Sequence, residues 1–312
     1  PDEKIKSKPT LTPNPVDAIA MLDKEKLHFV HGPFTAAVLG AAKGAKIQII
    51  AGSGKHGLTL LARPDLKVKS VADLKAQAGK GLKVGTLRKT PLELTWYGLI
   101  SDAGMAYKDF DMKFDFTPLS LMAALEEKQV DVITHGEPYA TMLEKKGAVR
   151  IGDSTETWGE GSPDCVVAVK EEFIANHPQT VKRYIRALLK ADQEIKKDLN
   201  KAAEAVHAGG FFKVDKAAYA AALPRQQPGV DLRKGRKGMN KAIGHMVALG
   251  YIKVAPKNLV DLSLLEEVIK EAQDAAAEKK KKEKEKKEKE KEKKMKDKPA
   301  PEPKKQAPAP KK

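Results

Sequence analysis

The segment LKVGTLRKTPLELTWYGLISDA, residues 82–103, contains the unit that decides the fold. Its first four residues, 82–85, form a short β-like run and predict a strand. Thr90, Pro91 and Glu93 form a capping box with proline at the first helical position, which predicts a helix to about Ala103. The segment therefore joins a strand to a helix through a polar loop.

The same alternation of a short apolar run and a helical segment recurs on both sides of this unit. We expect the other strands at residues 27–30, 46–51, 58–62, 113–116, 130–134, 149–151 and 165–169. Strands that alternate with helices predict an α/β protein with mostly parallel sheets flanked by helices. After the last of these strands the pattern is almost wholly helical, to about residue 277.

The strand–helix pattern occurs twice, and this doubling predicts two lobes. Lobe 1 is discontinuous and comprises residues 1–80 and 164–277, whereas lobe 2 comprises residues 81–163. We expect the chain to cross between the lobes near residues 78–82 and 159–164, where glycines are frequent and would suit hinges.

Residues 278–312 form a separate tail, first of Lys and Glu and then of Pro and Ala. Such a composition cannot bury a core, so we expect the whole tail to be solvated. Pairs such as Glu285 and Lys289 would help the first half to extend the preceding helix.

Composition excludes several classes of protein. The chain has 312 residues and a net charge of +16, of which the tail carries +9 and the remainder only +7. No Arg/aromatic stripe accompanies this charge, so we expect no nucleic-acid partner. No run approaches the roughly 20 apolar residues of a membrane-spanning helix. One cysteine excludes a disulfide framework and a four-cysteine zinc site.

Polar, glycine-rich loops follow the expected strands where a cleft between the lobes would open. Ligands of open parallel sheets bind beyond the carboxyl ends of the strands. The candidate ligand-binding residues on these loops are His31, Gly32, Phe34, Ser53, Lys55, Arg88, Lys89, Thr90, His135 and Glu137.

The chemistry of these loops leaves alternatives open. The loop at residues 52–57 lacks phosphate-loop spacing, so Ser53 either faces the cleft as a hydrogen-bond donor or lies in a simple turn. Arg88 and Lys89 precede a helix start, which favours an anion there, or they are solvated cations beside an ordinary cap.

Metal binding and catalysis are poorly supported. His31, His56, His135 and Glu137 could ligate an ion, but neither HExxH nor CxxC spacing accompanies them, so we expect no metal or cofactor. No G-x-S-x-G elbow occurs, and Cys165 lies in an expected buried strand, so we expect no catalytic residue.

Three stretches together carry a family resemblance. They are Val84-Gly85 with Thr90-Pro91; Ala123-Ala124-Leu125, Gln129-Val130-Asp131 and Glu137-Pro138; and residues 164–169 with Asn176-His177-Pro178. Across residues 16–250 the chain resembles type II periplasmic solute-binding proteins of ABC importers. The subgroup is that of nitrate, sulfonate, taurine and thiamine precursors (NMT1-like).

The resemblance implies a two-lobed, monomeric receptor that closes on a small solute and delivers it to the membrane subunits of an ABC transporter. It implies a periplasmic or extracytoplasmic location, with a leader that this chain does not contain. The implied contacts are the loop at residues 31–34, Ser53, the turn at residues 88–90, and Glu137. The family's opening strand and helix are missing here, which favours a fragment, and the charged tail is not a family feature.

The expected solute is small and polar or anionic, because Lys55, Arg88 and Lys89 lie on cleft loops and Glu137 could receive the amine of a zwitterion. The alternative is a flat aromatic ligand in an apolar cleft lined by Phe34, Trp96 or Tyr139.

Two further alternatives concern the function. One is an enzyme of the same fold that acts on a thiamine precursor through its histidines, and the other is an adaptor whose basic tail docks on acidic surfaces. The precursor-synthesising relatives carry a Cys-rich motif that this sequence lacks, which argues against an enzyme.

Overall fold

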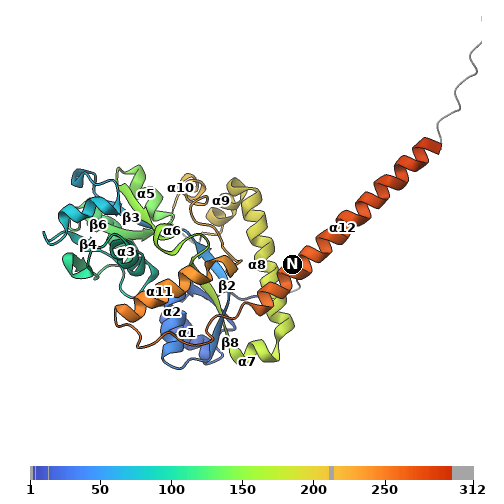
Figure 1. The fold of residues 1–312 in the computed structure, drawn as a ribbon, viewed down its shortest axis with the longest axis horizontal. Coiled ribbons are helices and arrows are strands. Elements are labelled where there is room, and N and C mark those ends of the chain that lie inside the picture. The colour runs from blue at the N-terminus through green and yellow to red at the C-terminus, as the bar shows by residue number, and fades with distance from the viewer. Residues whose placement is uncertain (1–2, 4, 13, 211–213, 297–312) are drawn as a thin grey trace, which may run out of the picture. The chain divides into compact units, whose positions relative to one another are not determined.

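The structure is a computed structural model that describes residues 3, 5–12, 14–210 and 214–296 (Figure 1). The chain divides into two units, Pro1–Glu266 and Glu267–Lys312. The first unit contains both sheets, and each unit is described here by itself.

The smaller sheet has three antiparallel strands in the order β1-β8-β2. Their bounds are Phe29–Pro33, Pro163–Lys170 and Ile47–Lys55. β8 lies in the centre, and its valines Val166, Val167 and Val169 are buried. Helices α1 (Pro15–Asp23) and α2 (Phe34–Ala42) pack together against β1 and β8.

The larger sheet has five strands in the order β5-β4-β6-β3-β7. In chain order the strands are β3 (Leu58–Ala62), β4 (Lys83–Gly85), β5 (Asp111–Lys113), β6 (Val132–Gly136) and β7 (Val149–Asp153). The associated helices are α3 (Pro91–Asp102), α4 (Pro118–Glu126), α5 (Tyr139–Lys145) and α6 (Ser154–Trp158). Trp96 of α3 is fully buried against this sheet and packs edge-on against Phe110.

The α/β class is confirmed, but the expectation of mostly parallel sheets is wrong. β4 runs parallel to β5 and β6, whereas β3 runs antiparallel to both β6 and β7. β3 enters the larger sheet directly from β2, after only His56 and Gly57, and its partners β6 and β7 come later in the chain.

The structure also moves the first crossing between the sheets. β3 belongs to the larger sheet, so the chain leaves the smaller sheet at His56–Gly57 and not near residues 78–82. Gly79 and Gly81 have positive φ angles and instead turn the chain into β4, within the larger sheet. The boundary expected near residue 80 is therefore displaced to the β2–β3 link. The chain returns to the smaller sheet through residues 159–162, directly before β8.

The two crossings are hydrogen-bonded to each other. The Gly161 amide donates to His56 Nε2 across 2.9 Å, and the Gly57 amide donates to Asp164 Oδ2 across 2.9 Å. The second crossing thus supplies an amide to a side chain of the first, and the first supplies an amide to Asp164 at the start of β8. We call these four residues the crossing pair.

Helix α11 (Arg236–Ala248) packs against α3 and α6 and closes on the second crossing. A Cβ atom placed on Gly235 would lie 2.0 Å from Gly161 O. One placed on Gly238 would lie 1.9 Å from Ser162 Oγ and 2.0 Å from Trp158 O. Only glycine therefore permits this approach of helix and crossing.

The remaining helices are α7 (Glu171–Asn176), α8 (Pro178–Lys197), α9 (Leu199–Ala208), α10 (Lys216–Ala222) and α12 (Ser263–Lys296). Short 3₁₀ turns occur at Pro64–Leu66, Val71–Gln77, Tyr107–Asp109 and Arg233–Gly235. The Lys/Glu segment does continue the helix before it, since α12 runs to Lys296, and residues 278–289 are exposed. The Pro/Ala half of the tail lies outside the described residues.

We predict opposite effects for two glycine substitutions in α11. Gly238→Ala should lower the free energy of unfolding by at least about 2 kcal/mol, because the methyl group overlaps a backbone carbonyl and Ser162. Gly244→Ala is the matched control: no atom lies within 4 Å of its added Cβ, so it should raise stability by roughly 0.5–1 kcal/mol. Urea denaturation measures both. Equal stability of the two variants would contradict the packing described.

Candidate functional site

Three polar side chains meet on one face of the smaller sheet. His31 Nδ1 lies 2.6 Å from Ser53 Oγ, and His31 Nε2 lies 2.7 Å from Tyr184 Oη. His31 is on β1, Ser53 is on β2 and Tyr184 is on α8, so the group spans the central strand. The Phe29 ring stacks on Tyr184 with centroids 3.9 Å apart and positions the phenol. We call His31, Ser53 and Tyr184 the histidine cluster.

The histidine cluster is an uncharged hydrogen-bond chain. His31 is exposed at the surface of the smaller sheet, but partial desolvation of its ring lowers its pKa below the ordinary value of 6.5, which favours the neutral form at neutral pH. A neutral imidazole donates through one nitrogen and accepts through the other. If the Tyr184 hydroxyl donates to Nε2, then Nδ1–H donates to Ser53 Oγ. The Ser53 hydroxyl proton is then free to donate to a solute.

The turn at residues 88–90 carries its cations on aromatic rings. The Arg88 guanidinium carbon lies 4.1 Å from the centroid of the Phe114 ring, and Lys89 Nζ lies 5.4 Å from that of Tyr251. Thr90 Oγ1 donates to Leu87 O and does not cap α3. The expected capping box is therefore not formed. Instead the amide of Lys89, one residue before the cap, donates to Glu93 Oε2.

Glu93 is a buried carboxylate that sequence reasoning treated only as part of a helix cap. Its side chain is 0% exposed. Oε1 accepts hydrogen bonds from the hydroxyls of Tyr107 and Tyr251, at 2.7 Å and 2.6 Å. With the Lys89 amide, these donors fix the start of α3 and the shape of the turn. No local signal marks the two tyrosines as partners, because Tyr251 is 158 residues away.

The loop after β6 does not present its acid to a cleft. The Glu137 side chain is only 1% exposed, and it pairs with Arg150 across 2.9 Å. The Thr141 amide donates to its other oxygen. Its surroundings therefore do not favour the expected role in binding a solute amine, because the carboxylate already has a cation. His135 is also buried: its Nε2 donates to Pro118 O, and its Nδ1 accepts from the Gly136 amide.

The other candidate residues are held in the core or by backbone pairing. Phe34 is fully buried, edge-on to Trp158, and Gly32 is paired with Val166 inside the smaller sheet. The Lys55 backbone exchanges two hydrogen bonds with Gln227. Of the ten candidate residues, the structure thus brings together His31 with Ser53, and Arg88 with Lys89 and Thr90.

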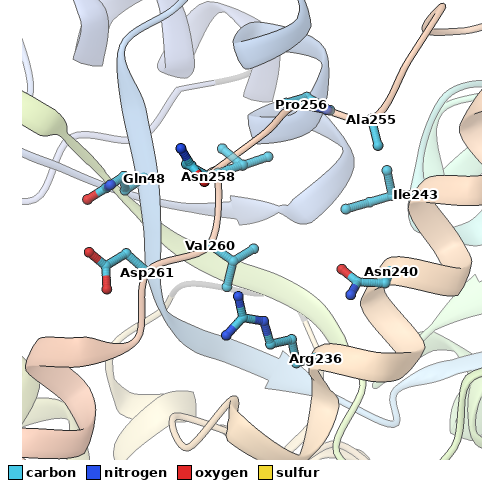
Figure 2. Close-up of a pocket in the computed structure, with 10 residues that line it drawn as sticks. Gln48, Arg236, Asn240, Ile243, Ala255, Pro256, Asn258, Val260 and Asp261 are labelled. Atoms are coloured by element: carbon cyan, nitrogen blue, oxygen red, sulfur yellow. The ribbon is translucent and has the colours of Figure 1, made fainter.

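A cavity of about 590 Å³ lies elsewhere in the first unit (Figure 2). Its lining comes from β2 and α11 and from the segment after α11: Gln48, then Arg236, Asn240 and Ile243, then residues 255–256 and 258–261. None of the ten candidate residues borders this cavity. We therefore centre the candidate site on the histidine cluster.

Asp164 of the crossing pair is a buried acid that sequence reasoning did not select. Burial raises its pKa to about 7, although the Gly57 amide and the Gln226 side chain act in the opposite direction. Its second oxygen, Oδ1, has no hydrogen-bond partner. Burying a carboxylate without full compensation favours its neutral form. The link between the sheets therefore contains a group that titrates near neutral pH.

The comparison with protein-family models identifies one family. A family model described as the NMT1-like family matches residues 8–208. No curated protein matches the chain in sequence. Among solved structures, the alkanesulfonate-binding protein SsuA from Xanthomonas axonopodis pv. citri, bound to MOPS, is 15% identical with a TM-score of 0.66. That match covers 80% of this chain and 86% of that protein.

Two further solved structures show the same fold. The periplasmic aliphatic sulphonate-binding protein SsuA from Escherichia coli is 15% identical with a TM-score of 0.66, covering 79% of each chain. The periplasmic nitrate-binding protein NrtA from Synechocystis is 15% identical with a TM-score of 0.64, covering 83% of this chain and 79% of that one.

In the described part of this chain, no group of three or more His, Cys, Asp or Glu could hold a metal ion. The described helices include none long and apolar enough to cross a membrane.

We predict that Asp164 makes stability fall as pH rises. Its folded pKa of about 7 is above the ordinary value of 3.8, so its stabilising contribution is full below pH 4 and is lost as pH rises to 7. Asp164→Asn keeps an acceptor for the Gly57 amide and does not titrate. Its unfolding free energy relative to the natural chain should therefore rise by on the order of 2–4 kcal/mol between pH 4 and 7.

Chemical denaturation of both proteins across this range measures the difference. His56, which also titrates nearby, is unchanged in the variant and cancels in the comparison. A difference that is constant with pH would contradict a raised pKa at Asp164.

Proposed function

The chain belongs to the NMT1-like family, and from that premise we propose that it is the substrate-binding component of an ABC importer. It captures a small polar or anionic solute, of the sulfonate, nitrate or thiamine-precursor type, in a cleft between two lobes built on its two sheets. The observation that carries this proposal is the histidine cluster, a hydrogen-bond chain that ends on a hydroxyl donor.

The donors of this cluster suit a weakly basic anion. Sulfonate and nitrate oxygens accept hydrogen bonds and remain charged at neutral pH, so they need donors and no proton acceptor. With the ring neutral and Tyr184 donating to it, Ser53 can only donate its remaining proton outward. The expected role of Ser53 as a hydrogen-bond donor therefore remains our proposal.

The turn at residues 88–90 supports an anion through its potential. Arg88 and Lys89 stand immediately before α3, whose free amide groups also favour negative charge. Their aromatic contacts hold the two cations without neutralising them, because the rings carry no charge. Arg88, Lys89 and Thr90 remain proposed contributors to binding.

The alternative of a flat aromatic ligand is less well supported. Phe34 and Trp96, two of the rings that would line such a cleft, are both 0% exposed. They are packed in the core and present no surface to a ligand.

The finer properties follow from the same assignment. The partners are the membrane subunits of the importer, and the location is periplasmic or extracytoplasmic. We propose that the receptor acts as a monomer and that its basic tail can contact acidic surfaces.

Substitution of Ser53 tests the proposal. Ethanesulfonate, taurine and nitrate are titrated into the protein by calorimetry. For a solute that binds, Ser53→Ala should weaken affinity about 10- to 150-fold, the cost of one charge-assisted hydrogen bond. Tyr184→Phe should weaken it less, since the phenol acts through His31.

The matched control is Ser101→Ala, at an exposed serine near the end of α3, which should bind as the natural chain does. Unchanged affinity for Ser53→Ala, or failure of all three solutes to bind at millimolar concentration, would refute the anion-binding role of the histidine cluster.

A further inference from the structure

Helix α12 carries a stripe of lysines on one face. Lys279, Lys282, Lys286 and Lys289 are spaced three, four and three residues apart, the spacing that places side chains on the same side of a helix. They are exposed, and the stripe extends over about 15 Å at 1.5 Å per residue. We call these four residues the lysine stripe.

The glutamates of the described segment lie beside the lysine stripe. Glu283 falls to one side of it, and Glu285 and Glu288 fall to the other. Glu278, at its beginning, pairs with Lys282 across 2.8 Å. Among the side chains that the structure describes, no carboxylate pairs with Lys279, Lys286 or Lys289. Residues 278–289 carry eight lysines against four glutamates, a net charge of +4.

This segment has charge but no apolar face. From residue 278 to residue 289 every side chain is Lys or Glu. An interfacial helix that inserts into lipid needs a large apolar face, so this helix cannot insert. A cationic, purely polar helix is instead attracted to an anionic surface through its lysines and stays outside the hydrocarbon.

We propose that the lysine stripe docks this protein on the anionic headgroups of a lipid bilayer. The flexible lysine side chains reach phosphates along the helix, while Glu278 and Glu283 lie beside the stripe and are outnumbered by its lysines. This inference rests on the proposed function only for its context, a receptor that works beside membrane subunits. The docking itself needs no solute.

Co-sedimentation of the full chain with lipid vesicles tests the proposal. The vesicles contain either phosphatidylcholine alone or phosphatidylcholine with about one third of the anionic lipid phosphatidylglycerol. The chain should bind the anionic vesicles, should not bind the neutral ones, and should be released as salt rises toward about 0.5 M, because the attraction is screened.

Two charge-conserving variants separate the stripe from net charge. The stripe variant combines Lys282→Glu with Glu283→Lys and Lys286→Glu with Glu285→Lys, which places two acids in the stripe. The control combines Lys284→Glu with Glu285→Lys and Lys287→Glu with Glu288→Lys, which leaves the stripe intact. Both keep the composition and the net charge of the chain. Circular dichroism checks that the helix content of each is unchanged.

The stripe variant should bind anionic vesicles at least about 25-fold more weakly, since each lysine near such a surface contributes about a fivefold gain in partitioning. The control should bind as the natural chain does. Equal binding by both variants, no binding of the natural chain to anionic vesicles, or tighter binding to duplex DNA than to vesicles would overturn the proposal. None of these outcomes depends on solute binding, so a failed solute titration leaves the vesicle result interpretable.

Discussion

Two hydrogen bonds of the crossing pair tie together the two passages of the chain between its sheets. The chain passes at His56–Gly57 and again before β8; the second passage supplies an amide to His56, and the first supplies an amide to Asp164 at the start of β8. The two crossing segments lie side by side, so they can bend together. Separating them would expose the buried carboxyl group of Asp164. Helix α11 and the turn before it cover the second crossing so closely that only glycine fits at residues 235 and 238. The relation between the two sheets is therefore set by a few backbone contacts.

The proposed site follows from the same arrangement. Because β8 returns between β1 and β2, His31 and Ser53 come to lie on either side of one strand, within reach of each other. Tyr184, on helix α8, completes the hydrogen-bond chain. The crossing pair lies just beyond, where β2 leaves the sheet only a few residues after Ser53. Any movement of one sheet relative to the other would thus pivot close to the histidine cluster.

Sequence predicts local features of this fold well and long-range pairing poorly. The strand, loop and helix of residues 82–103 emerge as β4 and α3 because apolar runs and proline at a first helical turn are local signals. The sheet to which residues 58–62 belong was misassigned, because their partners in β6 and β7 are some 70–90 residues away. The direction of the strands in the sheets was mispredicted for the same reason. No local signal shows whether the link after a strand turns back into the same sheet or leads into the other one.

The site shows the same division. The rule that ligands meet strand ends selected His31 and Ser53, which the structure brings together, but it could not find Tyr184 in the middle of a helix. It also selected Glu137, because sequence does not show that Arg150 neutralises it. The sequence around Asp164 and Glu93 does not indicate that these two acids are buried.

Nitrogen-15 NMR of the His31 ring tests the central claim most directly. The spectrum is recorded at neutral pH without solute and with a saturating anion that calorimetry shows to bind. We expect a neutral ring in both states, with the proton on Nδ1 in the complex and ring signals that shift on binding. A charged ring, a proton on Nε2 in the complex, or signals unchanged by a bound anion would contradict it.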